Sequence, residues 1–161
     1  MKKSAGFTLM ELMVVVAIIG IMSAIAIPNV FSWTQNRKFT GTVQRVVSIM
    51  NSAKMHAVKE NRPTVIIFDK AGNSFRAFVD LSNPPNLEEN SGDRLIDEYS
   101  IPDGVRILSS TFTSLADGKH QMVINSRGMP AAVNNGRVVI ESKRGLSNSI
   151  VVASTGRIRV E

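Results

Sequence analysis

The sequence has no cysteine, and its 161 residues include only two histidines, one tryptophan and one tyrosine. Without cysteine, no disulfide stabilises the fold. His56 and His120 lie far apart, and neither has a cysteine or a second histidine at ligand spacing, so no metal site and no cofactor are predicted. With so few large aromatic rings, a stacking platform for nucleic acid is poorly supported.

Motifs of catalysis are also missing. Serine is plentiful, but the sequence contains no Gly-x-Ser-x-Gly elbow, no Ser-x-x-Lys motif with its usual companions and no phosphate-binding glycine loop. The sequence therefore predicts that the protein is not an enzyme. A membrane-tethered enzyme is the remote alternative, and turnover of any substrate by the chain lacking residues 1–34 would establish it.

Charge is absent from a long stretch near the N-terminus. Residues Leu12–Trp33 carry none, and about 20 apolar residues are enough to cross a hydrocarbon core as a helix. This block is too long for a secretory signal peptide, whose apolar core spans about 7 to 15 residues. A carboxylate inside a membrane helix costs about 2.5 to 3.5 kcal/mol, so Glu11 at the edge of the block requires a partner. An ordinary single-pass anchor is the simpler alternative.

The residues around Glu11 form a motif. The run Lys2-Lys3…Gly6-Phe7-Thr8-Leu9-Met10-Glu11-Leu12 resembles the type III signal of prepilins and pseudopilins, the subunits of type IV pili and type II secretion systems. The resemblance implies that a prepilin peptidase cuts after Gly6 and methylates the new N-terminus at Phe7. It also implies that Glu11 neutralises the N-terminal amine of a neighbouring subunit, since a paired buried charge costs far less than an unpaired one.

Two residues inside the apolar block weaken a helix. Pro28 matches the family's helix-kinking proline; it cannot donate to the Ala24 carbonyl, and its ring crowds that turn. Gly20 adds a second soft point. The simpler explanation is that proline and glycine are commoner in membrane helices than in soluble ones.

Periodicity predicts the rest of the fold. Apolar residues recur at spacings of three and four after the block, so a helix is expected from Phe7 to about Val58, ending before Pro63. Alternating β-rich runs follow. The predicted strands are residues 64–69 and 74–80, which form a hairpin, and residues 104–109, 121–125, 137–142, 149–153 and 157–160. The fold class is α+β, a long N-terminal helix with a transmembrane half and an amphipathic half, packed on an antiparallel β-sheet domain as in the lollipop of pilins.

Three further segments resemble the GspH/FimT group of minor pseudopilins and minor pilins: residues 53–63, 124–130 and 150–160. The resemblance implies a leader at 1–6, a transmembrane and assembly helix at 7–33, an amphipathic helix at 34–62 and a β-rich periplasmic domain at 63–161. The implied protein is a single-pass inner-membrane subunit that enters a pilus, a pseudopilus or its tip complex. Its implied partners are other pilins or pseudopilins, the prepilin peptidase, the inner-membrane assembly platform and membrane lipid.

Charges in the second half suggest two alternatives. Lys143, Arg144, Arg157 and Arg159 make the C-terminal region basic, and FimT-like minor pilins of competence systems are associated with DNA binding through such a region. Solvated strand faces or contacts between subunits are the simpler explanation.

Acids collect in residues 80–98, whose Pro, Asn, Gly and Ser content predicts an exposed loop. A calcium site from Glu88, Glu89, Asp93 and Asp97 is conceivable because calcium takes several hard oxygens, but the spacing fits no EF-hand. A solvated loop is the favoured interpretation.

Overall fold

The computed structural model describes residues 7–131 and 135–161, with the backbone alone at residues 28 and 29. The chain divides into two compact units, an N-terminal unit of Met1–Arg37 and a C-terminal unit of Lys38–Glu161. Helix α1 (Leu9–Glu60) begins in the first and ends in the second.

The N-terminal unit is an apolar helix with a defined start. α1 begins at Leu9 rather than at the predicted Phe7, because the Thr8 hydroxyl accepts the Glu11 amide at 3.2 Å and acts as the N-cap. By length and composition the apolar part of α1 is able to cross a membrane, and none of that part is buried in the described structure. Helical backbone continues through Gly20 and Pro28, and a kink at either position stays a prediction.

The C-terminal end of α1 is closed by its own backbone. Asn61 has a φ of 51°, which places it in the left-handed region that commonly ends helices. The Arg62 amide then donates to the Ala57 carbonyl at 3.2 Å, and the Asn61 amide to Val58 at 3.4 Å. Because Pro63 follows directly, the helix ends where the sequence predicted.

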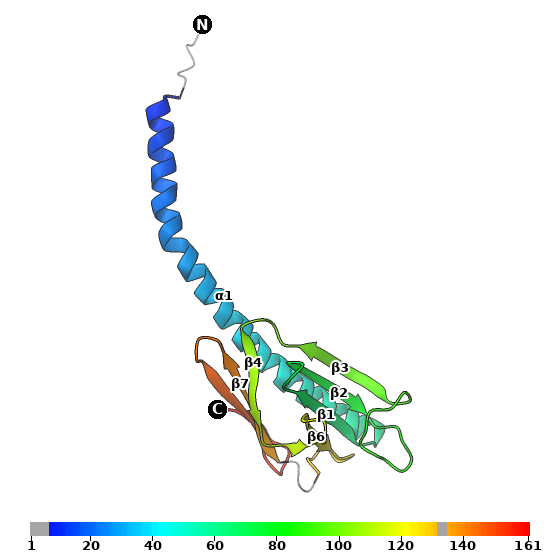
Figure 1. Ribbon diagram of the computed structural model, residues 1–161. Helices are drawn as coiled ribbons and strands as arrows, with labels where there is room; N and C mark the ends of the chain where they lie inside the picture. Colours follow the sequence, from blue (N-terminus) through cyan, green and yellow to red (C-terminus); the bar gives the residue numbers. More distant parts are fainter. Residues whose placement is uncertain (1–6, 132–134) are drawn as a thin grey trace. The chain divides into compact units, whose positions relative to one another are not determined.

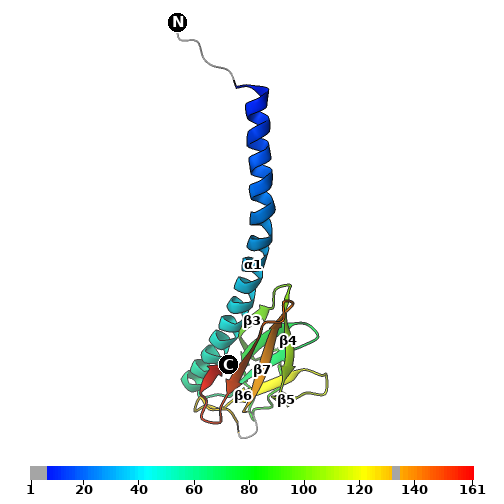
Figure 2. The ribbon, with the colours of Figure 1, turned by 90° about the vertical axis from the view of Figure 1, so that its left-hand side faces the viewer.

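Strands in the described part of the C-terminal unit form two antiparallel sheets (Figures 1 and 2). One sheet has the order β3-β2-β1-β6-β5 and the other β4-β7-β8-β9. The strands are β1 (Thr64–Asp69), β2 (Ser74–Val79), β3 (Arg94–Ser100), β4 (Val105–Ser110), β5 (Thr113–Ser114), β6 (His120–Ile124), β7 (Gly136–Ser142), β8 (Ser147–Val152) and β9 (Ile158–Val160). The predicted hairpin is β1–β2, and every other predicted strand is present within one or two residues.

The second half of α1 contributes one face to the core of the C-terminal unit. Val46, Met50, Ala53 and Ala57 are at most 1% exposed and belong to one apolar cluster with residues of both sheets. In Figures 1 and 2 the cyan part of α1 runs beside the sheets. Fully burying a side chain such as Val46 or Met50 contributes about 1.5 to 3 kcal/mol, so this packing stabilises the C-terminal unit.

The prediction of a loop throughout residues 80–98 is wrong at its end. Arg94–Ser100 is strand β3, which pairs with β2 at the edge of the five-stranded sheet. Its charged side chains are held from outside the strand, because Asp97 pairs with Arg45 of α1 at 2.9 Å and Arg94 pairs with Glu60. A charged edge strand also discourages pairing with foreign strands.

Candidate functional site

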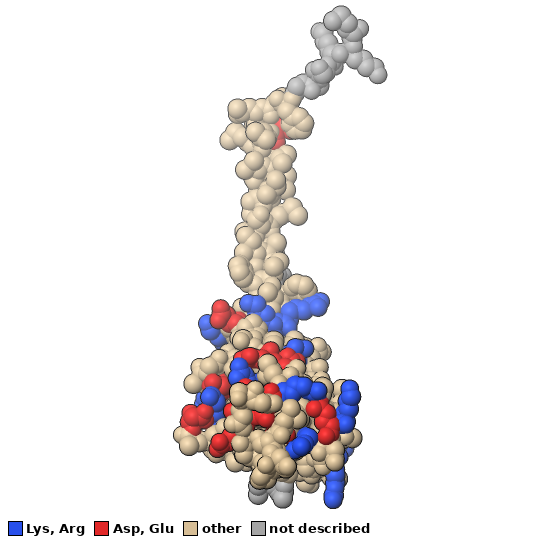
Figure 3. Space-filling view, turned by 90° about the vertical axis from the view of Figure 1, so that its right-hand side faces the viewer, with Lys and Arg blue, Asp and Glu red and all other residues tan. Residues whose placement is uncertain are grey.

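The predicted processing residue Phe7 and the predicted assembly residue Glu11 lie at the start of α1. Phe7 precedes the helix and is 80% exposed, while Glu11 lies in the first helical turn. Glu11 is the only charged residue among residues 7–36, and in Figure 3 the surface of this segment is almost entirely uncharged. No ion pair involves Glu11 within residues 7–131 and 135–161. Gly6 lies outside the described residues.

Thr8, which was not predicted as a site residue, caps the helix turn that carries Glu11. Its hydroxyl fixes the backbone of Glu11, and the positive end of the helix macrodipole favours a carboxylate in the first turn. The signal was present, because Thr8 and Glu11 have the Thr-x-x-Glu spacing of a capping box. The start of α1 therefore carries a carboxylate in its first turn, four residues after Phe7, which becomes the N-terminus if the leader is removed.

An aromatic and a cation mark the other end of the apolar stretch. The Arg37 guanidinium carbon lies 4.6 Å from the centroid of the Trp33 ring. Tryptophan is enriched at membrane interfaces, and a cation over its ring is attracted by the ring quadrupole. The pair is the kind of feature expected where a membrane helix leaves the hydrocarbon layer.

The four basic residues of the DNA alternative are not brought together. Lys143 and Arg144 lie in the turn after β7, whereas Arg159 pairs with Val151 in the register of β8 and β9. Val151 is four residues along β8 from its first residue, or about 13 Å, and Arg157 lies beyond it. Arg159 is also paired with Glu161 at 2.9 Å. One face of the C-terminal unit shows blue and red mixed together (Figure 3).

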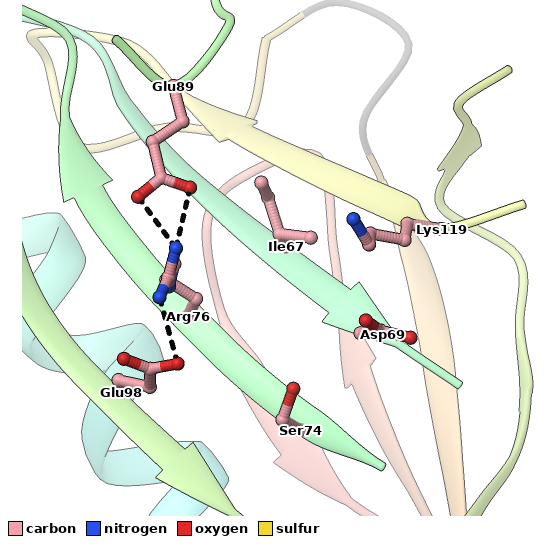
Figure 4. A pocket seen from close by; sticks show the side chains of 7 residues that line it. All are labelled: Ile67, Asp69, Ser74, Arg76, Glu89, Glu98 and Lys119. Atoms are coloured by element: carbon pink, nitrogen blue, oxygen red, sulfur yellow. Dashed lines mark hydrogen bonds and ion pairs between the residues drawn. The ribbon is translucent and has the colours of Figure 1, made fainter. Parts of the chain in front are cut away.

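A charged pocket of about 220 Å³ lies on the outer face of the five-stranded sheet (Figure 4). Arg76 donates to Glu98 at 3.0 Å and to Glu89 at 2.9 and 3.0 Å. The hydrogen bond to Glu98, followed by the one to Glu89, raises the pKa of Arg76 above its ordinary value. Ser74 lines the pocket without a hydrogen-bonded base. Three acids (Asp69, Glu89 and Glu98) face two cations (Arg76 and Lys119) in this lining, and the arrangement shows no activated nucleophile.

Three of the four acids of the calcium alternative have other partners. Glu89 binds Arg76, Asp97 binds Arg45, and Asp93 accepts the amides of Leu81 and Asn90 at 2.9 and 2.8 Å. No group of three or more His, Asp or Glu side chains is arranged to hold a metal ion among the described residues. The geometry gives no support to calcium binding.

Residues 42–156, well over half of the chain, match the family model described as type II transport protein GspH. The chain belongs to the GspH family. A second model, the prokaryotic N-terminal methylation motif, matches residues 1–27 of this GspH-family chain. The two matches confirm the resemblance that the N-terminal motif and the segments of the second half indicated.

Curated relatives align over part of the chain. A fimbrial protein of Pseudomonas aeruginosa is 46% identical over 65 residues, which are 40% of this chain and 42% of that protein. The type II secretion system core protein G of Aeromonas hydrophila is 31% identical over 61 residues, 38% of this chain and 43% of that protein. The GspH-family chain therefore spans less than half the length of these relatives.

Solved structures share the fold. The minor pseudopilin EpsH of the Vibrio cholerae type 2 secretion system has a TM-score of 0.58 at 10% identity, covering 77% of this chain and 96% of that one. The type IV minor pilin FimU of Pseudomonas aeruginosa has a TM-score of 0.57 at 12% identity, covering 80% and 92%. The predicted α+β pilin-like fold is confirmed, since likeness at these identities is a likeness of fold.

Proposed function

We propose that this GspH-family chain is a minor pseudopilin or minor type IV pilin, a structural subunit that assembles through its N-terminal helix. The observation that carries the proposal is the lone carboxylate of Glu11 in the first turn of an exposed apolar helix. A buried charge without a partner is costly, and removing one member of a buried pair costs about 3 to 5 kcal/mol. The missing member is the amine of a neighbouring subunit, which cleavage before Phe7 would create.

The same helix has two successive roles in this proposal. Before assembly, α1 anchors the chain as a single pass in the inner membrane, with Trp33 and Arg37 at the boundary and the C-terminal unit in the periplasm. After a prepilin peptidase cuts between Gly6 and Phe7, the helix leaves lipid and packs against other pilins or pseudopilins at the assembly platform. Softening at Gly20 and Pro28 would let it adjust to this second environment.

Intact mass spectrometry of the full chain, co-expressed with a prepilin peptidase, tests the processing step. The expected product begins at Phe7 and carries one added methyl group. The matched control is Gly6→Leu, whose β-carbon and bulk should leave the leader in place, because an extended backbone at the cleft requires a small residue. A mature chain that begins at another residue would contradict the assignment.

Replacing Glu11 tests the assembly step. Glu11→Ala should insert into membranes as well as the wild type, because it removes a charge from the apolar segment. Its recovery in sheared filaments or in a purified tip complex should fall, because the neighbour's amine then has no partner. Normal recovery alongside normal membrane levels would remove the proposed role of Glu11.

DNA binding is the second candidate function, and the observation in its favour is Arg157. This residue is exposed and forms no ion pair among the described residues. Arg157→Ala combined with Arg159→Ala should weaken binding of duplex DNA and flatten its dependence on salt. Lys143→Ala with Arg144→Ala, at the far end of β8, removes the other two candidate cations, so comparing the two variants shows which pair contributes to binding. No binding by the wild-type chain at low salt would end this candidate.

A further inference from the structure

Three segments that are distant in sequence meet at the C-terminal end of α1. The Lys54 Nζ donates to the Gly156 carbonyl at 2.6 Å, which ties the helix to the turn before β9. A Cβ added at Gly128 would lie 3.0 Å from Cγ2 of Val58, and one added at Gly156 would lie 3.0 Å from the Gly128 carbonyl oxygen. The junction is close-packed, so the surface above it has a fixed shape.

That surface is an open groove of about 610 Å³ with an apolar floor. Three residues on the floor remain accessible to solvent, since Met55 is 66% exposed, Val58 56% and Met129 41%. Covering these side chains with a partner would stabilise the complex by roughly 25 cal/mol per Å² of apolar surface buried. Methionine adapts its shape to different apolar partners.

Cations surround the floor. Lys54, Lys59 and Arg127 line the groove, and no Asp or Glu does. In the part of the chain that the structure describes, none of the three cations forms an ion pair. The Lys54 ammonium group has three N–H donors. One donates to the Gly156 carbonyl, and two remain for a ligand. The groove therefore combines apolar contact with positive charge that nothing in the described chain neutralises.

We infer that this groove, defined by Lys54, Met55, Val58, Lys59, Arg127 and Met129, binds an acidic peptide segment of another protein that carries a large apolar side chain. The apolar side chain covers the methionines, and flanking carboxylates reach the cations on the rim. Complementary charges of this kind orient a partner and speed its association. The inference concerns residues 54–59, 127–129 and 155–156 of the C-terminal unit and does not depend on the role of Glu11.

Two other occupants fit less well. Nucleic acid would meet the cations, but phosphates gain nothing from covering Met55 and Val58, and the lining contains no aromatic ring for a base to stack on. A second copy of the chain offers its acidic loop, yet Asp80 and Asp93 are bound by loop amides and Glu89 by Arg76. Only Glu88 of that loop is then left to meet three cations. A partner with free carboxylates matches the groove better than either.

The test uses the full-length chain in non-ionic detergent micelles and fluorescently labelled 12-residue peptides, read by anisotropy with empty micelles as the blank. An alternating Glu/Leu peptide should bind saturably and more weakly at high salt. The matched Gln/Leu and Glu/Ser peptides, which lack charge or apolar side chains, should each bind at least about fivefold more weakly. Equal binding of the Gln/Leu and Glu/Leu peptides would overturn the inference.

Variants at exposed positions locate the site without disturbing the core. Lys59→Gln with Arg127→Gln should weaken binding of the Glu/Leu peptide about fivefold, and Met55→Ser with Val58→Ser about tenfold. Lys143→Gln with Arg144→Gln removes the same charge elsewhere and should change little. Equal losses in the two charge variants would contradict the inference. Two further results would contradict the inference. One is that duplex DNA displaces the peptide in a way that depends on Lys59 and Arg127, and the other is that the chain self-associates through these residues.

Discussion

Asp80 holds the loop after β2, and its replacement offers a quantitative test of the structure. The carboxylate is fully buried and accepts the amides of Ser82 at 2.9 Å and Leu87 at 2.7 Å. Burial by itself raises the pKa of Asp80, but the backbone hydrogen bonds from Leu87 and Ser82 and smaller contributions outweigh it, so the pKa is lowered. The loop is therefore organised around an ionised group.

Asp80→Asn keeps the shape of the side chain but provides one acceptor oxygen instead of two. One amide, that of Ser82 or Leu87, then faces an NH₂ group and loses its bond. A hydrogen bond to a charged group contributes about 1.5 to 3 kcal/mol, and a buried amide left unpaired costs about 1 to 3 kcal/mol. We expect the free energy of unfolding to fall by about 3 kcal/mol at pH 7.

The effect should depend on pH in a known direction. Because the folded-state pKa of Asp80 lies below its unfolded value of about 3.9, the stabilisation is present above that value and lost as pH falls through the folded pKa. The difference in the free energy of unfolding between wild type and Asp80→Asn should therefore become smaller below about pH 4.

Urea unfolding measures both the loss of stability at pH 7 and its dependence on pH. It is done on the full chain in non-ionic micelles and followed by circular dichroism. Hydrogen exchange of residues 81–90 by mass spectrometry adds the local effect, which should be faster in Asp80→Asn. The control Asp103→Asn makes the same chemical change at an exposed position and should alter stability little. Identical unfolding of wild type and Asp80→Asn at pH 7 would show that the charge of Asp80 does not hold the loop.

Three more predictions follow from close contacts and are checked in the same micelles. In urea unfolding, Gly156→Ala should lower the free energy of unfolding by about 1 to 2 kcal/mol more than Gly145→Ala does. Both glycines have positive φ, but of the two only Gly156 has neighbours within 4 Å. Equal losses would contradict the close approach at Gly156. Thr8→Ala should destabilise the first turn of α1 by about 1 kcal/mol and speed hydrogen exchange there, while Thr8→Ser should not. Asn73→Ala removes hydrogen bonds to Val105 and Ile107 of β4, at 2.9 and 3.2 Å, and should cost about 2 kcal/mol in urea unfolding; no change would show that this link between the sheets is dispensable.

Much of the fold was predictable because the pattern of apolar residues is local. β1 was predicted to the residue, and the buried face of α1 follows the spacing of three and four. β3 was missed because its charges are typical of a loop, and what holds it is supplied by Arg45 and Glu60 of α1, more than 30 residues away in sequence. Such partners are invisible to a local pattern.

The sites divide in the same way. The roles of Phe7 and Glu11 stay predictions, and they were drawn from a contiguous motif. The cap at Thr8 could have been predicted from its spacing to Glu11. The separation of Arg157 from Lys143 was not predictable from the sequence, because only the register of β8 and β9 shows that they lie far apart. The groove above Val58 was not predictable from the sequence either, since residues 54–59, 127–129 and 155 come together only after folding.

We propose that the charge of Glu11 determines incorporation of the chain into the filament. The most direct test expresses wild type and Glu11→Gln together in one cell. Mass spectrometry of the peptide containing residue 11 then gives their ratio in membranes and in purified filaments. Gln keeps the size and polarity but removes the charge, so we predict depletion from filaments by at least about tenfold, with Glu11→Asp depleted less. The same ratio in filaments and membranes would contradict the account.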